Sequence, residues 1–324
     1  MPFDYEEFDL STVRTYPLAT RHSKARAEGF AKPHAPGDSF VRWLASLPDM
    51  LGARDLRAVI SSIRDARRRG AGIVWGLGAH VIKTGLSPVI IDLMERGYVS
   101  AIAMNGAGVI HDFEVALSGA TSEDVDEALG PGRFGMAEET GRALNEAIRS
   151  AAAESRGLGQ TVAAMLASMG SAYAGASIAV SAHRLSIPLT VHVAVGTDII
   201  HMHPDASGAA LGDASLRDFR YFVSSIARLE GGVYLNCGSA VVLPEVFLKA
   251  IALARNRGIA LDNLTTVNID FMRMYRPLTN VVNRPVAGTS GRGYSLVGHH
   301  EILIPLIAAA LVEGTASSGG DGLQ

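Results

Sequence analysis

The sequence predicts an α/β fold with a doubly wound, mostly parallel sheet, and three observations predict it. Short apolar runs bounded by glycine recur along the chain, and segments with helical periodicity separate them. Repeated strand–helix units of this kind imply parallel strands with helices on both faces. The chain shows no break in composition, and 324 residues, 48% of them hydrophobic, can bury one large core.

The expected elements run in order from residue 53 to residue 312. The first helix keeps its apolar residues on one face, and the second has Pro88 near its start and Gly97 after its end. Expected helices cover residues 53–69, 86–96, 109–117, 158–182 (a closely packed pair), 215–229, 244–255 and 301–312. Expected strands cover residues 72–79, 99–104, 188–195, 232–236 and 265–271. A mobile loop is expected at 283–293, where glycine is frequent.

The expected domain organisation is one domain with two flanking segments. Prolines interrupt residues 1–52, which we interpret as an N-terminal arm or lid. Residues 53–314 form the single α/β domain, and residues 315–324 form a flexible tail. The uncharged run at 158–182 is long enough to span a bilayer, but its small residues favour a buried helix pair.

Composition excludes some functions and suggests a location. A formal net charge of −3 argues against nucleic acid as the main partner, because such proteins usually carry a concentrated basic face. The single cysteine, Cys237, forms no intramolecular disulfide and suits a reducing compartment. The first 24 residues have no apolar core typical of a signal peptide. We therefore expect a soluble, cytoplasmic protein.

Polar, glycine-bearing segments follow four of the expected strands, at residues 78–85, 105–112, 196–198 and 237–240. In a parallel sheet these segments meet at the carboxyl ends of the strands, where ligands bind. Glycines let the backbone approach a pyrophosphate, and the amides that open the next helix can donate to it. The sequence therefore predicts a dinucleotide site, with Asn105–Gly108 as the phosphate-side loop. The Gly-x-Gly-x-x-Gly pattern is absent, because Val81 stands where the third glycine belongs.

Residues 85–112 (GLSPVIIDLMERGYVSAIAMNGAGVIHD) resemble the deoxyhypusine synthases, in which a helix, a short strand and a glycine-rich loop precede two acidic residues. Ile187–Pro188 with Thr197–Asp198, the run GVYLNCGSA at 232–240 and HHEILIP at 299–305 resemble later family segments in the same order. The resemblance implies a Rossmann-like NAD-binding domain of the deoxyhypusine synthase type, assembled as a homotetramer with sites at subunit interfaces. It implies that NAD is held by Asn105, Ala107, Gly108, Asp112, Asp198 and Ser239. Gly106, Thr197, Gly238 and Glu301 stand in the same segments and complete the expected cofactor site.

The chain departs from that family at the residue that carries its chemistry. Family members oxidise spermidine with NAD and pass its aminobutyl group through an imine on a lysine in a Trp-Gly-Lys segment. Here the corresponding residues, 275–298, contain neither tryptophan nor lysine. Arg284 and Arg292 cannot replace it, because arginine stays protonated. The usual covalent route is therefore in doubt.

Other residues are candidates for the chemistry. Lys83 is the only lysine in the expected site, where it would form an imine or else bind phosphate or cap a helix. His111, His299 and His300 are candidate proton-transfer groups, since histidine titrates near neutrality, and a histidine at 299–300 can instead cap the last helix. Candidate substrate-binding residues are His80, His201 and Arg284. Asp198, His201 and His203 in DIIHMHPD are an alternative metal site, although we favour a polar loop without metal.

The leading hypothesis is a deoxyhypusine-synthase-like, NAD-dependent enzyme that oxidises a small-molecule amine, a polyamine or an amino acid, to an imine and then transfers or eliminates a group. An NAD-dependent amino-acid deaminase or cyclodeaminase is the alternative among enzymes. A non-catalytic NAD-binding sensor is the alternative outside them. A metal-dependent hydrolase built on DIIHMHPD remains a fourth.

Overall fold

The structure, a computed structural model, describes residues 4–316 of the chain. It contains one six-stranded, all-parallel sheet in the order β3-β2-β1-β4-β5-β6. The strands are β1 (Ile73–Leu77), β2 (Ala101–Asn105), β3 (Leu189–His192), β4 (Val233–Cys237), β5 (Thr265–Asp270) and β6 (Arg292–Val297). The predicted α/β fold with a doubly wound parallel sheet is therefore confirmed.

The topology determines where a ligand site lies. The chain moves outward from β1 to β2 and β3, and then returns to place β4 on the other side of β1. The order of the strands reverses between β1 and β4, so the turns that follow these two strands lead to opposite faces. In open parallel sheets ligands bind beyond the carboxyl ends of the strands at this switch point.

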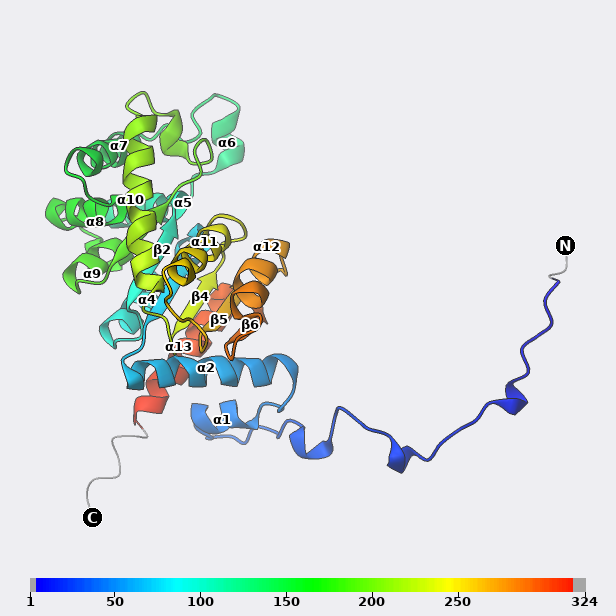
Figure 1. The fold of residues 1–324 in the computed structure, drawn as a ribbon. Helices are drawn as coiled ribbons and strands as arrows, with labels where there is room; N and C mark the ends of the chain where they lie inside the picture. Colours follow the sequence, from blue (N-terminus) through cyan, green and yellow to red (C-terminus); the bar gives the residue numbers. More distant parts are fainter. Residues whose placement is uncertain (1–3, 317–324) are drawn as a thin grey trace, which may run out of the picture.

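Helices cover both faces of the sheet (Figure 1). On one face α10 and α11 bury an aromatic cluster in which Tyr234 of β4 stacks on Phe247 at a ring distance of 3.8 Å. On the other face α2 packs against α13, and Trp75 of β1 is completely buried. The longer helices are α2 (Leu51–Arg69), α4 (Ser87–Glu95), α5 (Gly106–Ser118), α7 (Glu138–Ala153), α8 (Leu158–Met169), α10 (Gly208–Ile226), α11 (Val242–Asn256) and α13 (His300–Ala316). The shorter ones are α1 (Phe40–Ser46), α3 (Ala79–Lys83), α6 (Val125–Leu129), α9 (Ile178–Arg184) and α12 (Tyr275–Pro277).

One prediction of the sequence requires correction. The region expected as a mobile loop at 283–293 contains a 3-10 turn (Arg284–Val286) and the first residues of β6, which pairs with β5. Glycine concealed this strand, because Gly293 lies against the Val282 carbonyl and has no room for a side chain. The helix pair expected at 158–182 is confirmed, because the run forms α8 and α9, which pack against each other, and α8 ends at Gly170 in a left-handed conformation. Within residues 4–316, no helix combines the length and apolarity that crossing a membrane requires.

The N-terminal arm leads away from the domain (Figure 1). Between residues 4 and 39 its only helical segments are three 3-10 turns, and α1 then packs beside α13. Its apolar side chains, including Tyr5, Phe8 and Tyr16, are exposed. A role as a lid stays a prediction. Of the expected tail, residues 317–324 lie outside the described part of the chain.

Candidate functional site

A cavity of about 160 Å³ lies at the switch point between the carboxyl ends of β1, β4 and β5. Residues from the turns after all three strands, and the first residue of α13, form its wall. They are His80, Gly238, Ala240, Asp270, Phe271, Met272, Met274 and His300. Three of the predicted site residues, His80, Gly238 and His300, therefore meet in one place.

The turns after β1 and β4 approach each other through their backbones. Gly78 N donates to Cys237 O at 2.8 Å, and Gly238 N donates to Ile269 O at 3.2 Å. A Cβ atom on Gly78 would lie 2.1 Å from Gly238 O, so no larger residue fits there. Gly238 has φ +69°, which side-chain-bearing residues rarely adopt. The two glycines therefore bring His80 and His300 to the same cavity.

His300 is completely buried and has a defined tautomer. Its Nε2 lies 2.9 Å from Ile269 O, and because a carbonyl oxygen only accepts, Nε2 must carry the hydrogen. In the neutral ring Nδ1 is then the acceptor nitrogen, and within residues 4–316 it has no hydrogen-bond partner. The His80 ring lies 5.5 Å from the His300 ring, edge to face. His300 is thus a buried base beside the cavity.

The neighbouring histidine, His299, has a different environment. It is exposed, its ring lies parallel to Phe271 at 6.1 Å, and its Nδ1 lies 3.7 Å from Glu301. Glu301 is also exposed and lies outside the cavity wall. Of the two adjacent histidines, His299 therefore lies on the surface and His300 belongs to the site.

Asp270 is a site residue that the sequence analysis missed. It is the last residue of β5, is 6% exposed, and accepts a bond from Met272 N at 3.4 Å. The predicted strand TTVNIDF was extended past Asp270 to Phe271, which concealed a carboxylate at a strand end. A strand boundary placed one residue earlier would have brought Asp270 into the group of strand-end polar residues.

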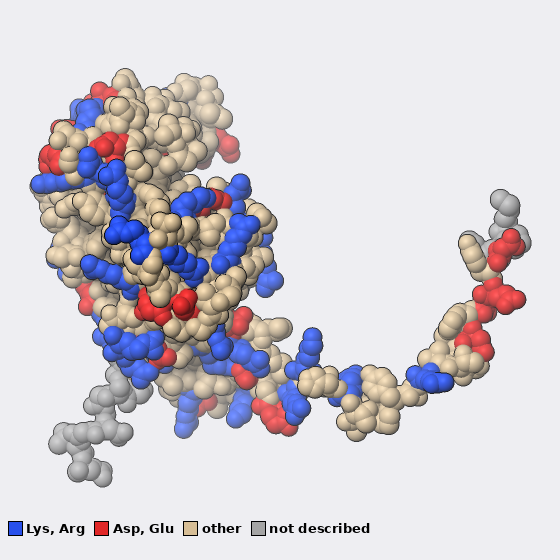
Figure 2. Space-filling view, viewed as in Figure 1, with Lys and Arg blue, Asp and Glu red and all other residues tan. Residues whose placement is uncertain are grey.

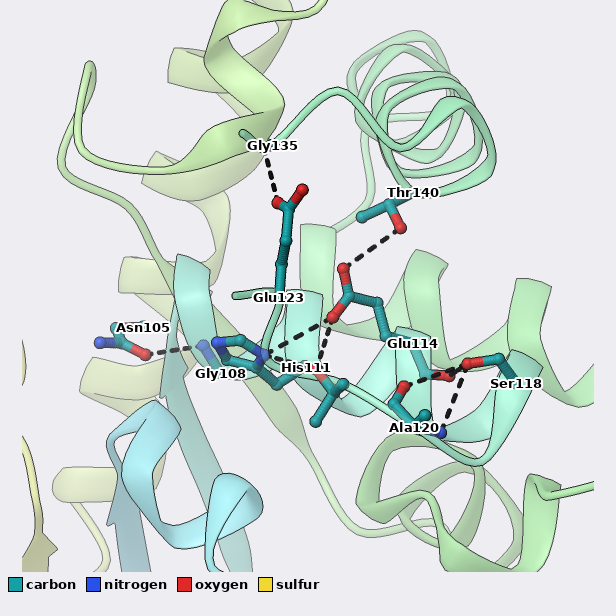
Figure 3. Close-up of polar contacts among 10 residues, drawn as sticks. Asn105, Gly108, His111, Glu114, Ser118, Ala120, Glu123, Gly135 and Thr140 are labelled. Atoms are coloured by element: carbon teal, nitrogen blue, oxygen red, sulfur yellow. Dashed lines mark hydrogen bonds and ion pairs between the residues drawn. The ribbon is translucent and has the colours of Figure 1, made fainter. Parts of the chain in front are cut away.

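The turn after β2 is not an open phosphate loop. Asn105 Oδ1 accepts from Gly108 N at 2.8 Å and caps α5 (Figure 3). The Asp198 carboxylate accepts from Ala107 N, and a Cβ on Gly106 would lie 1.9 Å from Asp198 Oδ2. Burial raises the pKa of Asp198, opposed by His201 and by the Ala107 N–H. The prediction that these helix amides are free for phosphate therefore needs correction, because side chains of the chain itself occupy them.

His201 and His203 are turned away from each other. His201 Nδ1 accepts from Gly196 N and Asp198 N at 3.1 and 3.2 Å, so its Nε2 carries the hydrogen, 3.9 Å from Asp198 Oδ2. His203 packs against Gly141 of α7 and accepts from Asp205 N. Among residues 4–316, no three His, Cys, Asp or Glu side chains are grouped as a metal site would require.

Asp112 has a structural role in this fold. It is completely buried within α5, and its two oxygens accept from Ser177 Oγ, Ile178 N and Ala179 N at 2.6–3.0 Å. Burial raises the pKa of the Asp112 carboxyl, whereas these bonds oppose the rise. These contacts cap α9, and a contact between Asp112 and a cofactor stays a prediction.

His111 belongs to a separate polar cluster on α5 (Figure 3). Its Nδ1 lies 2.6 Å from Thr121 Oγ1, and Thr121 and Thr140 both donate to Glu114. Burial opposes ionisation of Glu114, but the bonds from His111, Thr121 and Thr140 outweigh it and lower the pKa of this carboxyl. Glu123, on the segment that precedes α6, accepts from Gly135 N at 2.8 Å. This cluster lies outside the switch-point cavity.

The remaining predicted site residues also lie outside the cavity wall. Lys83 is exposed at the end of α3, so the burial that would activate an imine-forming amine is not provided here. Thr197 is exposed and donates to Ala194 O, and Ser239 Oγ accepts from Leu243 N at the start of α11. Arg284 is exposed and donates to Asn280 Oδ1.

No family model matches the chain, and no curated protein matches it in sequence. Solved structures of similar fold include a "conserved putative LOR/SDH protein" from Methanococcus maripaludis S2 (17% identity, TM-score 0.50, 82% of this chain and 71% of that one). AgrE, solved as a ternary complex with ornithine and NAD+, has 17% identity and TM-score 0.52 over 84% of this chain, which spans 35% of AgrE. A "putative deoxyhypusine synthase" from Entamoeba histolytica has 13% identity and TM-score 0.51 over 88% of this chain and 96% of that one. The predicted resemblance to deoxyhypusine synthase is confirmed as a resemblance of fold.

Proposed function

We propose that the carboxyl edge of the sheet binds NAD and that the switch-point cavity is where a small amine substrate is oxidised. The observation that carries the proposal is the buried His300, which lines the cavity at the reversal of strand order and whose Nδ1 has no hydrogen-bond partner within residues 4–316. Similar folds include AgrE, solved with ornithine and NAD+, which supports the choice of cofactor and of substrate class.

The residues present are suited to a dinucleotide. The turn Gly78–His80 follows the central strand, the position that holds the pyrophosphate in sheets of this strand order. Asn105 and Asp198 lie at the end of the neighbouring strand, β2, where a carboxylate binds the ribose hydroxyls. Asp198 Oδ2 is buried beside Gly106 and has no hydrogen-bond partner within residues 4–316, and we propose that it accepts from a ribose hydroxyl. The nicotinamide end would then lie toward β4 and β5, beside His300.

The chain's own groups account for the proton transfer. When bound, NAD would supply the acceptor for the hydride from the carbon that bears the amine. His300 Nδ1 would take the proton that the nitrogen loses as the substrate becomes an imine, because Nε2 already donates to Ile269 O. Asp270, in the same cavity wall, would stabilise the imidazolium or the substrate cation by its charge. Phe271, Met272 and Met274 would contact the apolar part of the substrate, and water or a second amine of the substrate would attack the imine carbon to release ammonia.

Release of ammonia from the imine is favoured over group transfer through lysine. Residues 275–298 contain no lysine, and Lys83 is exposed outside the cavity. An NAD-dependent deaminase or cyclodeaminase is therefore the reaction class that this chain supports best. A cavity of about 160 Å³ is small for a dinucleotide and substrate together, so we propose a homo-oligomer, a tetramer by the family resemblance, in which a partner subunit completes the site.

The experiment compares neighbouring histidines by the same substitution. Purified protein is mixed with NAD+ and a panel of amines that includes ornithine and spermidine, and NADH absorbance and released ammonia are measured. His300→Gln retains a donor for Ile269 O and should lower kcat by about 100-fold or more, with little change in the Kd for NAD+. His299→Gln should change kcat less than about threefold, because His299 lies outside the cavity.

Three results would contradict the proposal in different ways. Failure of the wild-type protein to bind NAD+ would refute the cofactor. Tight NAD+ binding without NADH formation from any amine would support the non-catalytic sensor instead. Equal losses of kcat in both histidine variants would remove His300 from its role as the base.

A further inference from the structure

A second, larger cavity opens at the opposite edge of the sheet. Its volume is about 840 Å³, within the range of small-molecule sites in proteins. Its wall combines the segments that precede β1, β2 and β3 with one face of α8 and the last turns of α10. None of its lining residues belongs to the switch-point cavity, so the two sites are separate.

One wall of this cavity contains a buried carboxyl group. Asp218 of α10 is 1% exposed, and its Oδ2 accepts from Gly159 N at 2.8 Å and from Val191 N at 2.7 Å. Oδ1 is buried beside Gly157 at the start of α8, and within residues 4–316 it makes no hydrogen bond. Burial raises the pKa of Asp218 to about 7, although the N–H groups of Gly159, Val191 and Leu158 oppose the rise. A buried oxygen with an unused acceptor position is costly unless a ligand supplies a donor.

The mouth of the same cavity is basic. Tyr221, Ser225 and Arg228 follow Asp218 at helical spacing, and all four residues line the cavity. Arg228 is exposed, ten residues beyond Asp218, which corresponds to about 15 Å along the helix axis. Figure 2 shows basic side chains over the lower end of α10 and over the adjacent end of α2, whose last turn contains Arg67, Arg68 and Arg69.

We propose that this cavity binds a small zwitterion, with a primary ammonium on the Asp218 carboxyl group and an acidic group on Arg228. The Asp218 carboxyl group can accept a hydrogen bond from an ammonium group, and the positive charge strengthens that bond. At the mouth of the cavity, the Arg228 guanidinium attracts a carboxylate. The side chain of Arg228 spans part of the distance to Asp218. The ammonium and the acidic group of the ligand must bridge the rest, so a chain of a few carbon atoms separates them and not a single carbon atom. The ligand is therefore an ω-amino acid or a diamino acid.

The test is a chain-length series measured by calorimetry on the full-length protein. The probes are glycine, 4-aminobutanoate and 6-aminohexanoate, together with butylamine and butanoate as compounds that lack one charge. We expect one of the two longer zwitterions to bind at least about tenfold more tightly than glycine, butylamine or butanoate. Equal affinities across the series, or no binding of any probe at millimolar concentration, would overturn the proposal.

Two substitutions test the assigned contacts. Asp218→Asn retains one oxygen for Gly159 N and Val191 N and replaces Oδ1 by a donor, so it should weaken ammonium binding by about tenfold or more while the fold is retained. Asp213→Asn is the matched control on the same helix, since Asp213 pairs with Arg217 and lies outside the cavity wall. Wild-type affinity in Asp218→Asn would refute the assignment.

The basic end has its own pair of variants. Arg228→Gln should weaken the zwitterion by about tenfold and leave butylamine unaffected, because only the acidic group contacts Arg228. Arg220→Gln is the control, since Arg220 is exposed on α10 outside the cavity wall. A similar loss in Arg220→Gln would show that general surface charge, and not the cavity, attracts the ligand. Retained circular dichroism in all variants confirms that affinity and not folding has changed.

Discussion

The turns after β1 and β2 have similar sequences, GLGAH and NGAGV, but they differ in what surrounds them. In the turn after β2 the backbone amides already have acceptors from the same chain. Asn105 Oδ1 accepts from Gly108 N, and the Asp198 carboxylate accepts from Ala107 N. The turn after β1 lies against Gly238 and borders a cavity with an unpartnered histidine nitrogen. Glycine content alone therefore does not identify a ligand loop.

The difference lies in how each turn's polar groups are satisfied. An anion site needs amides that are free, and a helix N-terminus whose amides already have acceptors provides less attraction. The same reasoning applies to Asp112, because both of its carboxylate oxygens already accept hydrogen bonds from residues at the start of α9.

The largest effect is expected for the turn after β1. Gly78→Ala would place a Cβ atom 2.1 Å from Gly238 O, and backbone atoms cannot move aside as a flexible side chain can. We expect a loss of about 3 kcal/mol or more in the free energy of unfolding, measured by urea denaturation. Gly52→Ala, in the first turn of α2 with open space around it, should be neutral or stabilising by up to about 1 kcal/mol. A Gly78→Ala loss below about 1 kcal/mol would show that β1 and β4 are not held this closely.

The fold was predictable from the sequence because its signals are local. Apolar runs such as IVWGL and VYLNC are buried strands in the structure, and the helical periodicity of residues 53–69 corresponds to α2. β6 escaped prediction because its sequence, RGYSLV, has only one buried residue, Leu296, and follows a glycine-rich stretch. Its pairing with β5 is a tertiary contact that local composition does not report.

The site was less predictable, because it depends on which atoms lack partners. Sequence placed His80, Gly238 and His300 at strand or helix ends, and the fold brings them together. The sequence could not show that Asp112 and Ser239 accept hydrogen bonds from the first turns of α9 and α11. It also could not distinguish His299 from His300, since the two differ only in the direction each side chain takes from the start of α13.

The next effect concerns the opposite edge, where burial raises the pKa of Asp218 from 3.8 to about 7. Between about pH 4 and 7 the unfolded chain loses this proton and the folded chain keeps it, so the wild type loses stability as pH rises. The upper bound is on the order of 4 kcal/mol over this range. Asp218→Asn has no such group, so the wild-type-minus-variant difference in unfolding free energy should fall by up to this amount between about pH 4 and pH 7 and stay constant above pH 7.

This measurement must be made as a difference between the two proteins. Burial lowers the pKa of His192 to about 3, so the same interval contains an opposite contribution, in which stability is lost as pH falls from 6.5. Both proteins contain His192, and its contribution cancels in the difference. A wild-type-minus-variant difference that stays flat from pH 4 to 8 would show that Asp218 is not desolvated.

The smallest effect is expected at Asp198 and follows from the proposed ribose contact at the end of β2. The buried, unpartnered Oδ2 would accept a ribose hydroxyl of NAD+ and repel the 2′-phosphate of NADP+. Asp198→Asn keeps an acceptor for Ala107 N and removes the charge, so the preference for NAD+ over NADP+ should fall by about tenfold, roughly 1.4 kcal/mol, in the ratio of the two Kd values. Asp205→Asn, a matched change at a more exposed carboxylate in the same loop, should leave that ratio unchanged. If Asp198→Asn also leaves it unchanged, Asp198 serves only to fill the start of α5, and the dinucleotide lies entirely on the β1 side.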